Sequence, residues 1–164
     1  MNIDVRLLSA LISAVVALII AFSNHFIIQP LKAKRKFKRK KLTDFYMPLY
    51  GILTARINLA RDVCYEKREI VLGCRSDDPY LKKHFMEEFI LNHAGYASQD
   101  LIFAWSNYSY SADRWTTKIL VKCIVKEYNQ LLKELGRNYN KEELETGIPE
   151  IIKGFRDMDD DKAS

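Results

Sequence analysis

The chain has 164 residues, of which 48% are hydrophobic and 29% charged, values typical of a globular protein and not of a disordered one. Its net charge of +5 is concentrated in residues 32–41, which hold eight Lys and Arg and no acidic residue. Residues 42–164 carry 17 basic and 20 acidic side chains, a net charge of −3, so we expect no surface that binds duplex nucleic acid.

The three cysteines, Cys64, Cys74 and Cys123, are widely spaced and no cluster of Cys and His accompanies them. This spacing argues against a disulfide framework or a metal site, and it fits free thiols in a reducing compartment. The sequence also lacks Gly-rich phosphate loops and the common catalytic motifs. We therefore expect no catalytic residue, no metal, no cofactor and no enzyme activity.

A short N-terminal tail, residues 1–6, precedes an apolar run over residues 7–28 that contains no Asp, Glu, Lys or Arg. As a helix this run would be roughly 33 Å long, enough to cross a bilayer core of about 30 Å. It is longer than the apolar part of a signal peptide, about 7–15 residues, and the basic cluster after it opposes translocation. We expect a single-pass protein of the inner (plasma) membrane, with the N-terminus outside and the C-terminal domain in the cytoplasm.

Small residues recur at every fourth position of this run, at Ser9, Ser13, Ala17 and Ala21. Such spacing lets helix backbones approach closely, so it favours a homo-oligomer, although Ala and Ser are also common in membrane helices generally. Residues 29–41 are expected to continue the helix out of the bilayer.

The basic cluster of residues 32–41 is expected to contact anionic lipid headgroups. A nucleic-acid-binding arm is the alternative for a run of this kind.

Apolar residues at spacings of three and four predict that residues 42–156 form a small cytosolic helical bundle, and the whole chain is assigned to the all-α class. The first helix of this domain begins near Leu42 and ends near Gly73. Pro48 lies within it and predicts a kink or a restart.

Helix-start and helix-stop residues delimit the next two helices. Asp78 is suited to cap a helix that has Pro79 at its first position and ends before Gly95. Ser98 begins a third, short helix, and the polar stretch 106–111 is expected to be a loop.

The clearest amphipathic helix predicted in the domain covers residues 113–135 and is stopped by Gly136. A last short helix opens at Asn140, with Glu143 at the position of a capping box. The acidic tail, residues 157–164, is expected to be disordered.

Basic and aromatic side chains concentrate between residues 105 and 126, where lysines recur every fourth residue and aromatic rings alternate with Ser and Asn. Flat rings beside hydrogen-bonding groups and localised positive charge suit a nucleotide. They also suit a protein interface, buried tryptophans with covering tyrosines, or a solvated lysine face. The candidate ligand-binding residues are Trp105, Asn107, Tyr108, Tyr110, Arg114, Lys118, Lys122 and Lys126.

The layout of one apolar span, a basic juxtamembrane run and a helical cytosolic domain resembles small CRISPR-associated membrane proteins of antiviral defence that are gated by cyclic oligoadenylate. The resemblance covers the layout alone, and it implies an oligomer whose cytosolic domains bind a cyclic oligonucleotide and whose spans then act on the membrane. Two further functions fit the same layout: a constitutive anchor or scaffold that recruits a protein partner, and an accessory subunit of a membrane complex.

Overall fold

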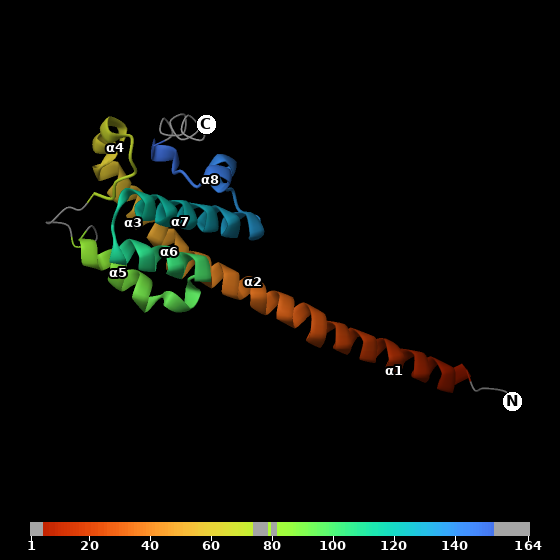
Figure 1. Ribbon diagram of the computed structural model, residues 1–164. Helices are drawn as coiled ribbons and strands as arrows, with labels where there is room; N and C mark the ends of the chain where they lie inside the picture. The colour runs from red at the N-terminus through yellow and green to blue at the C-terminus, as the bar shows by residue number, and fades with distance from the viewer. Residues whose placement is uncertain (1–4, 74–78, 80–81, 153–164) are drawn as a thin grey trace. The chain divides into compact units, whose positions relative to one another are not determined.

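The computed structural model describes residues 5–73, 79 and 82–152, and every regular element in these ranges is helical. The expected all-helical class is confirmed for this part of the chain. Figure 1 labels the helices along the chain, which divides into two compact units, Met1–Arg39 and Lys40–Ser164.

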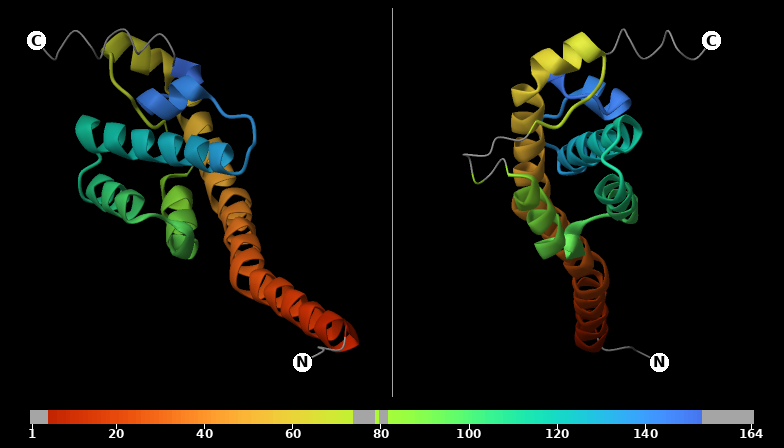
Figure 2. Two further views of the ribbon diagram at one scale, coloured as in Figure 1. Left: turned by 90° about the vertical axis from the view of Figure 1, so that its right-hand side faces the viewer. Right: turned by 60° about the vertical axis from the view of Figure 1, so that its left-hand side comes forward.

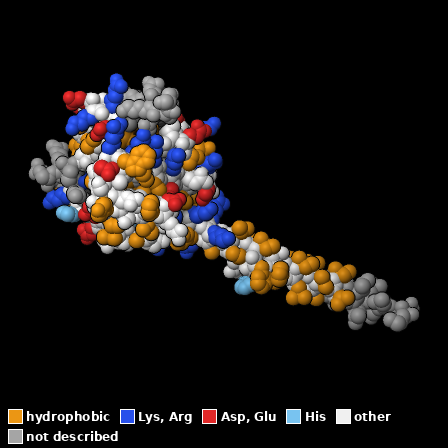
Figure 3. Space-filling view, in the orientation of Figure 1, with side chains coloured by type: hydrophobic (Ala, Val, Ile, Leu, Met, Phe, Trp, Pro, Cys, Tyr) orange, Lys and Arg blue, Asp and Glu red, His pale blue; other side chains and the backbone are white. Residues whose placement is uncertain are grey.

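The N-terminal unit consists of α1 (Val5–Ser23), a π-helical turn η1 (Asn24–Ile28) and most of α2 (Gln29–Lys41). Figure 3 shows hydrophobic side chains along this helix, and none of those described between Leu11 and Ile28 is buried. The core helix of a soluble domain would bury such residues. Among the described residues, this helix alone is long and apolar enough to cross a membrane.

Two prolines of the N-terminal helical run are each preceded by a π-helical turn. Pro30 follows η1, and Pro48 follows η2 (Leu42–Tyr46), in each case two residues after the turn ends. Proline has no N–H, and its ring crowds the carbonyl four residues earlier in an α-helix. The wider π turn relieves this crowding, and the N–H of Met47 donates to the carbonyl of Leu42, five residues back. The restart expected at Pro48 takes this form.

The prediction that the first helix of the domain continues to near Gly73 is wrong. α3 (Met47–Leu59) ends at Ala60, where φ is −98° and ψ is 7°, and the short α4 (Arg61–Lys67) follows. The chain after α4 then returns along α3. The N–H of Gly73 donates to the carbonyl of Arg56 at 3.1 Å, and Nε of Arg56 donates to the carbonyl of Gly73 at 3.2 Å.

The second helix of the prediction corresponds to α5 (Lys83–Asn92), which begins later than the expected start at Pro79. Its N-cap position is Lys82, whose side chain makes no capping hydrogen bond. Asp78, the predicted cap, lies outside the described residues.

The loop expected over residues 106–111 is also wrong, because α6 (Gln99–Tyr110) remains helical to its last residue. The helix starts where predicted, and the Ser98 side chain caps it by accepting the N–H of Leu101. Leu101, Ala104 and Tyr108 recur at helical spacing and are all buried. Packing along this face therefore outweighs the turn preference of the Ser- and Asn-rich sequence.

The longest described helix of the domain is α7 (Arg114–Glu134), which matches the predicted range 113–135 and is capped by the Asp113 side chain through the N–H of Thr116. A left-handed Gly136, with φ of 68°, follows its C-terminus.

The final helix, α8 (Lys141–Thr146), is capped by Asn140, whose side chain accepts the N–H groups of Glu142 and Glu143. The capping box itself does not form. The N–H of Asn140 donates to the side chain of Asn129, and the carboxylate of Glu143 is bound by other groups.

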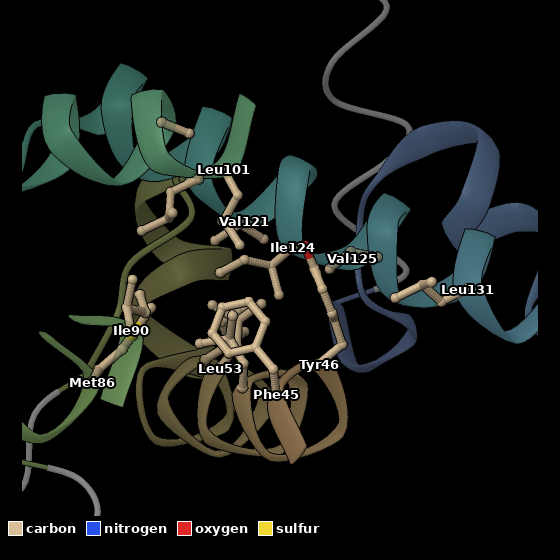
Figure 4. Close-up of a cluster of buried hydrophobic side chains, with 14 of the residues drawn as sticks. Phe45, Tyr46, Leu53, Met86, Ile90, Leu101, Val121, Ile124, Val125 and Leu131 are labelled. Carbon is tan, nitrogen blue, oxygen red and sulfur yellow. The ribbon is translucent and has the colours of Figure 1, made fainter. Parts of the chain in front are cut away.

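Helix α7 organises the domain because it packs against α3, α6 and α8, while α5 packs against α3. The two views of Figure 2 show α7 running beside α6 and crossing α3. Figure 4 shows buried side chains from these helices meeting in one core, including Phe45, Leu53, Met86, Ile90, Leu101, Val121 and Ile124.

Candidate functional site

The predicted aromatic residues of α6 do not form one stacking surface. Tyr108 is buried in the domain core, whereas Tyr110 is 94% exposed. Trp105 and Asn107 are half-buried. Trp105 packs against the core, and its indole N–H is buried with no acceptor among the described residues.

The predicted lysines of α7 lie in a different environment from these rings. Lys122 packs against the turn after α8, where a Cβ added to Gly147 would lie 2.9 Å from the Cα of Lys122. Lys118 and Lys126 are one helical turn to either side and share its face. Arg114, at the start of α7, instead lies near Tyr108.

Tyr108 and Arg114 line the same cleft, which has a volume of about 340 Å³. Its walls come from α3, the segment after α4, the end of α6 and the start of α7. The cleft is lined by Arg56, Glu69, Ile70, Val71, Leu72, Tyr108, Ala112, Asp113, Arg114 and Thr117. The structure therefore divides the predicted site: two of its residues line this cleft, and the three lysines do not.

Arg114 is a half-exposed residue of the cleft and joins it to the segment after α4. Its Nη1 lies 3.4 Å from Oε1 of Glu69, and its Nη2 donates to the carbonyl of Arg68 at 3.2 Å. Arg68 is left-handed, with φ of 53°, the one non-glycine residue described with a positive φ. Arg114 thus fixes the chain direction where α4 ends.

The acidic groups of the cleft are already engaged. Glu69 pairs with Arg114. The carboxylate of Asp113 accepts the N–H of Thr116 at 2.9 Å and the hydroxyl of Ser111 at 3.0 Å. These hydrogen bonds lower the pKa of Asp113, with the backbone bond from Thr116 as the largest cause, so Asp113 stays ionised as the cap of α7.

Arg56 is not among the residues predicted for the site, and it is 2% exposed although arginine side chains are rarely buried. Its Nε donates to the carbonyl of Gly73 and its Nη1 lies 3.2 Å from Sδ of Met86. The residues around Arg56 in the sequence do not indicate its burial, because its partners Gly73 and Met86 are distant along the chain.

The comparisons with known proteins found no match. No protein-family model, no curated protein and no solved structure is significantly similar to the chain.

Two carboxylates outside the cleft, the buried Glu143 and the half-buried Glu127, accept hydrogen bonds from within the domain. Glu143 accepts from Tyr50, Asn129 and the N–H of Glu150. Such complete bonding is typical of a structural network and leaves little for a ligand.

The second carboxylate, Glu127, accepts from the hydroxyls of Tyr46 and Ser98, and the thiol of Cys123 lies 3.6 Å from it. Burial and then Glu127 raise the pKa of Cys123 to about 12, so this thiol is unreactive near neutral pH.

The domain also carries large exposed apolar side chains on α6 and α7, namely Ile102, Phe103, Tyr110 and Trp115. Phe103 and Trp115 are each 69% exposed. Figure 3 shows hydrophobic side chains interspersed with both signs of charge on the unit Lys40–Ser164.

Proposed function

We propose that the chain is a single-pass protein of the inner membrane whose cytoplasmic helical domain binds a small anionic ligand of the nucleotide type. The span is assigned to the apolar run 7–28, whose described side chains from Leu11 onward are not buried. The basic cluster after it orients the N-terminus outward and the domain toward the cytoplasm. Assembly through the small residues from Ser9 to Ala21 would let ligand binding act on the membrane.

The basic cluster of residues 32–41 would hold the start of the domain at the bilayer surface. Its side chains lie on α2, which has no buried residue. Each Lys or Arg near an anionic leaflet contributes about 1 kcal/mol of attraction. Anionic headgroups are therefore the proposed partner of this segment.

The observation that carries the ligand proposal is the presence of Tyr108 and Arg114 in one cleft. The cleft volume of about 340 Å³ is at the small end of the range for ligand sites, about 300–1,000 Å³. It can take one phosphate-bearing unit and not a whole cyclic oligonucleotide. A cyclic messenger would then extend beyond one cleft, which suits a site shared between copies of the chain.

The test is isothermal titration calorimetry of the full-length protein in detergent against cyclic di-, tri- and tetranucleotides and mononucleotides. At least one should bind with a Kd below about 100 μM. Arg114→Gln should weaken this binding about tenfold, the low end for a charge-assisted hydrogen bond. Lys126→Gln is the matched control, because Lys126 does not line the cleft.

Failure of every nucleotide to bind would end the proposal. Binding that is lost in Lys126→Gln and retained in Arg114→Gln would move the site from the cleft to the lysine face of α7.

A second candidate function is a membrane-anchored scaffold, and the exposed aromatic side chains of α6 and α7 favour it. Aromatic residues are enriched in protein interfaces. A photo-crosslinking amino acid at position 110 would capture a defined protein partner in cells, whereas the same residue at the exposed Lys141 would not. Equal crosslinking from both positions would count against the scaffold.

A further inference from the structure

The guanidinium group of Arg56 is buried without a carboxylate partner. Among the described residues, no acidic oxygen lies within 4.0 Å of it, and its hydrogen-bond acceptors are the carbonyl of Gly73 and the sulfur of Met86. An arginine does not lose its charge in a protein. Buried charges are normally paired, because removing an ion from water is unfavourable unless an opposite charge replaces the solvent.

The hydrogen-bond capacity of Arg56 is also only partly used. A guanidinium has five N–H donors. Nε uses one of them on Gly73, and Nη1 directs one toward Met86, whose sulfur is a weak acceptor. Three donors on the two terminal nitrogens therefore remain for a ligand in the cleft that Arg56 lines.

Two arginines and two carboxylates line the cleft, so its formal charge is zero, and Arg56 is the arginine without an ion-pair partner among the described residues. Glu69 is paired with Arg114, and Asp113 is held by the N-terminus of α7. A bound group with one negative charge would neutralise Arg56. A group with several charges would be repelled by the two carboxylates.

We propose that Arg56 binds a single phosphodiester group in this cleft, with its free terminal N–H donors directed at the phosphate oxygens. A phosphodiester carries one negative charge and presents oxygens that match the planar guanidinium fork. The inference rests on the proposed function, since the phosphate belongs to the nucleotide ligand of the same cleft. Arg114 and Tyr108 then contact the rest of that ligand.

The experiment uses the full-length protein in a non-ionic detergent, which contains no phosphate, and dimethyl phosphate as a phosphodiester of fixed single charge. Titration calorimetry at constant ionic strength should give a Kd on the order of 1 mM. Arg56→Met removes the charge at similar side-chain length and should weaken binding at least about tenfold. Arg61→Met is the control, because Arg61 is an exposed arginine on the neighbouring helix α4.

A second pair of variants tests the site without changing a buried residue. Ala112 is an exposed residue of the cleft, so Ala112→Glu adds a carboxylate there without disturbing buried packing. It should abolish dimethyl phosphate binding, whereas Ala112→Gln, of the same size and without charge, should retain it.

Three results would overturn the assignment: no binding of dimethyl phosphate to the wild type, unchanged binding in both Arg56→Met and Ala112→Glu, or acetate binding as tightly as dimethyl phosphate. The last would identify a carboxylate site instead. The two proposals fail separately. Dimethyl phosphate binding that depends on Arg56, with no cyclic nucleotide bound, removes the nucleotide function and keeps the phosphate site. Nucleotide binding that is unaffected by Arg56→Met removes the phosphate site at Arg56 and keeps the nucleotide function.

Discussion

The hydroxyl of Tyr50 donates to both carboxylate oxygens of Glu143, at 2.8 and 3.0 Å, and so joins α3 to α8. The same carboxylate accepts the side-chain amide of Asn129 at 2.9 Å and the N–H of Glu150 at 2.7 Å. Glu143 is 3% exposed, so these donors replace the water that it loses on folding. One side chain of α8 thereby holds three separate segments of the domain.

Removing one donor from this network should destabilise the domain. Tyr50→Phe keeps the ring stacked on Tyr128, at a centroid distance of 4.3 Å, but leaves Glu143 short of a hydrogen bond. We expect the free energy of unfolding to fall by about 1–3 kcal/mol. Thermal unfolding followed by circular dichroism would measure it.

Tyr128→Phe is the matched control. The hydroxyl of Tyr128 makes no hydrogen bond within the described residues, so its loss should cost less than about 0.5 kcal/mol. Equal effects of the two substitutions would mean that the Tyr50–Glu143 bond contributes nothing of its own.

Cys123 should make stability depend on pH in the alkaline range. Burial and Glu127 raise the pKa of its thiol to about 12 in the folded state, from an ordinary value of 9.0. The unfolded chain therefore loses this proton first, and the stabilisation is complete below about pH 9 and declines as pH rises toward 12. Between pH 8 and pH 10 the wild type should lose about 1 kcal/mol more than Cys123→Ala. Parallel pH profiles of the two proteins would exclude this role.

Gly147 should tolerate no side chain, because two constraints apply at one position. Its φ is 73°, and an added Cβ would lie 2.9 Å from the Cα and the Cβ of Lys122. Gly147→Ala should cost more than about 2 kcal/mol. Gly136 has a similar φ of 68° but open space around it, so Gly136→Ala should cost only about 1 kcal/mol. Denaturant unfolding of both variants separates backbone strain from the close contact.

The small-residue positions of α1 predict how the chain assembles. The hydroxyl of Ser13 donates to the carbonyl of Ser9, so it is satisfied within its own helix. Replacing Ser13 and Ala17 with Leu should hold neighbouring backbones apart and weaken the oligomer at least about tenfold. Val15→Leu, on the opposite side of α1, should leave it unchanged. Crosslinking in detergent would report both, and an unaffected double variant would place assembly elsewhere.

Membrane topology can be tested with single cysteines in a variant whose native cysteines are replaced by alanine. Asn2→Cys should react with an impermeant maleimide added to intact cells, because the basic cluster keeps its own side of the helix inside. Ala33→Cys should react only after the cells are opened. Labelling of position 33 in intact cells would show that the orientation is the reverse of the one proposed.

The starts of α6, α7 and α8 could be predicted from the sequence because the chemistry of their caps is local. Ser98, Asp113 and Asn140 each accept N–H groups within three residues of themselves. No comparable signal marks the end of α3. Alanine has the highest helix propensity, so Ala60 does not predict a break. The break depends on the segment after α4, where the N–H of Gly73 donates to the carbonyl of Arg56.

The candidate site was predicted only in part for the same reason. The concentration of basic and aromatic residues between positions 105 and 126 predicts Tyr108 and Arg114, and both line the cleft. Arg56 was not selected, because an arginine among apolar residues at helical spacing normally lies on the exposed face. Its burial comes from residues 70–73 and Met86, which no periodicity within α3 can indicate.

The contacts that Arg114 makes with Glu69 and with the carbonyl of Arg68 have a kinetic consequence. The side chains of Arg114 and Glu69 are 51% and 35% exposed, so dissolved salt screens their attraction. These contacts hold the segment after α4 against the start of α7, at one wall of the cleft. Rising ionic strength would loosen that wall and speed the exchange of a bound molecule, while it also weakened attraction to the buried charge. The residence time of a ligand in the cleft would then shorten for two reasons: the wall held by Arg114 opens more often, and the ligand is attracted less strongly to Arg56.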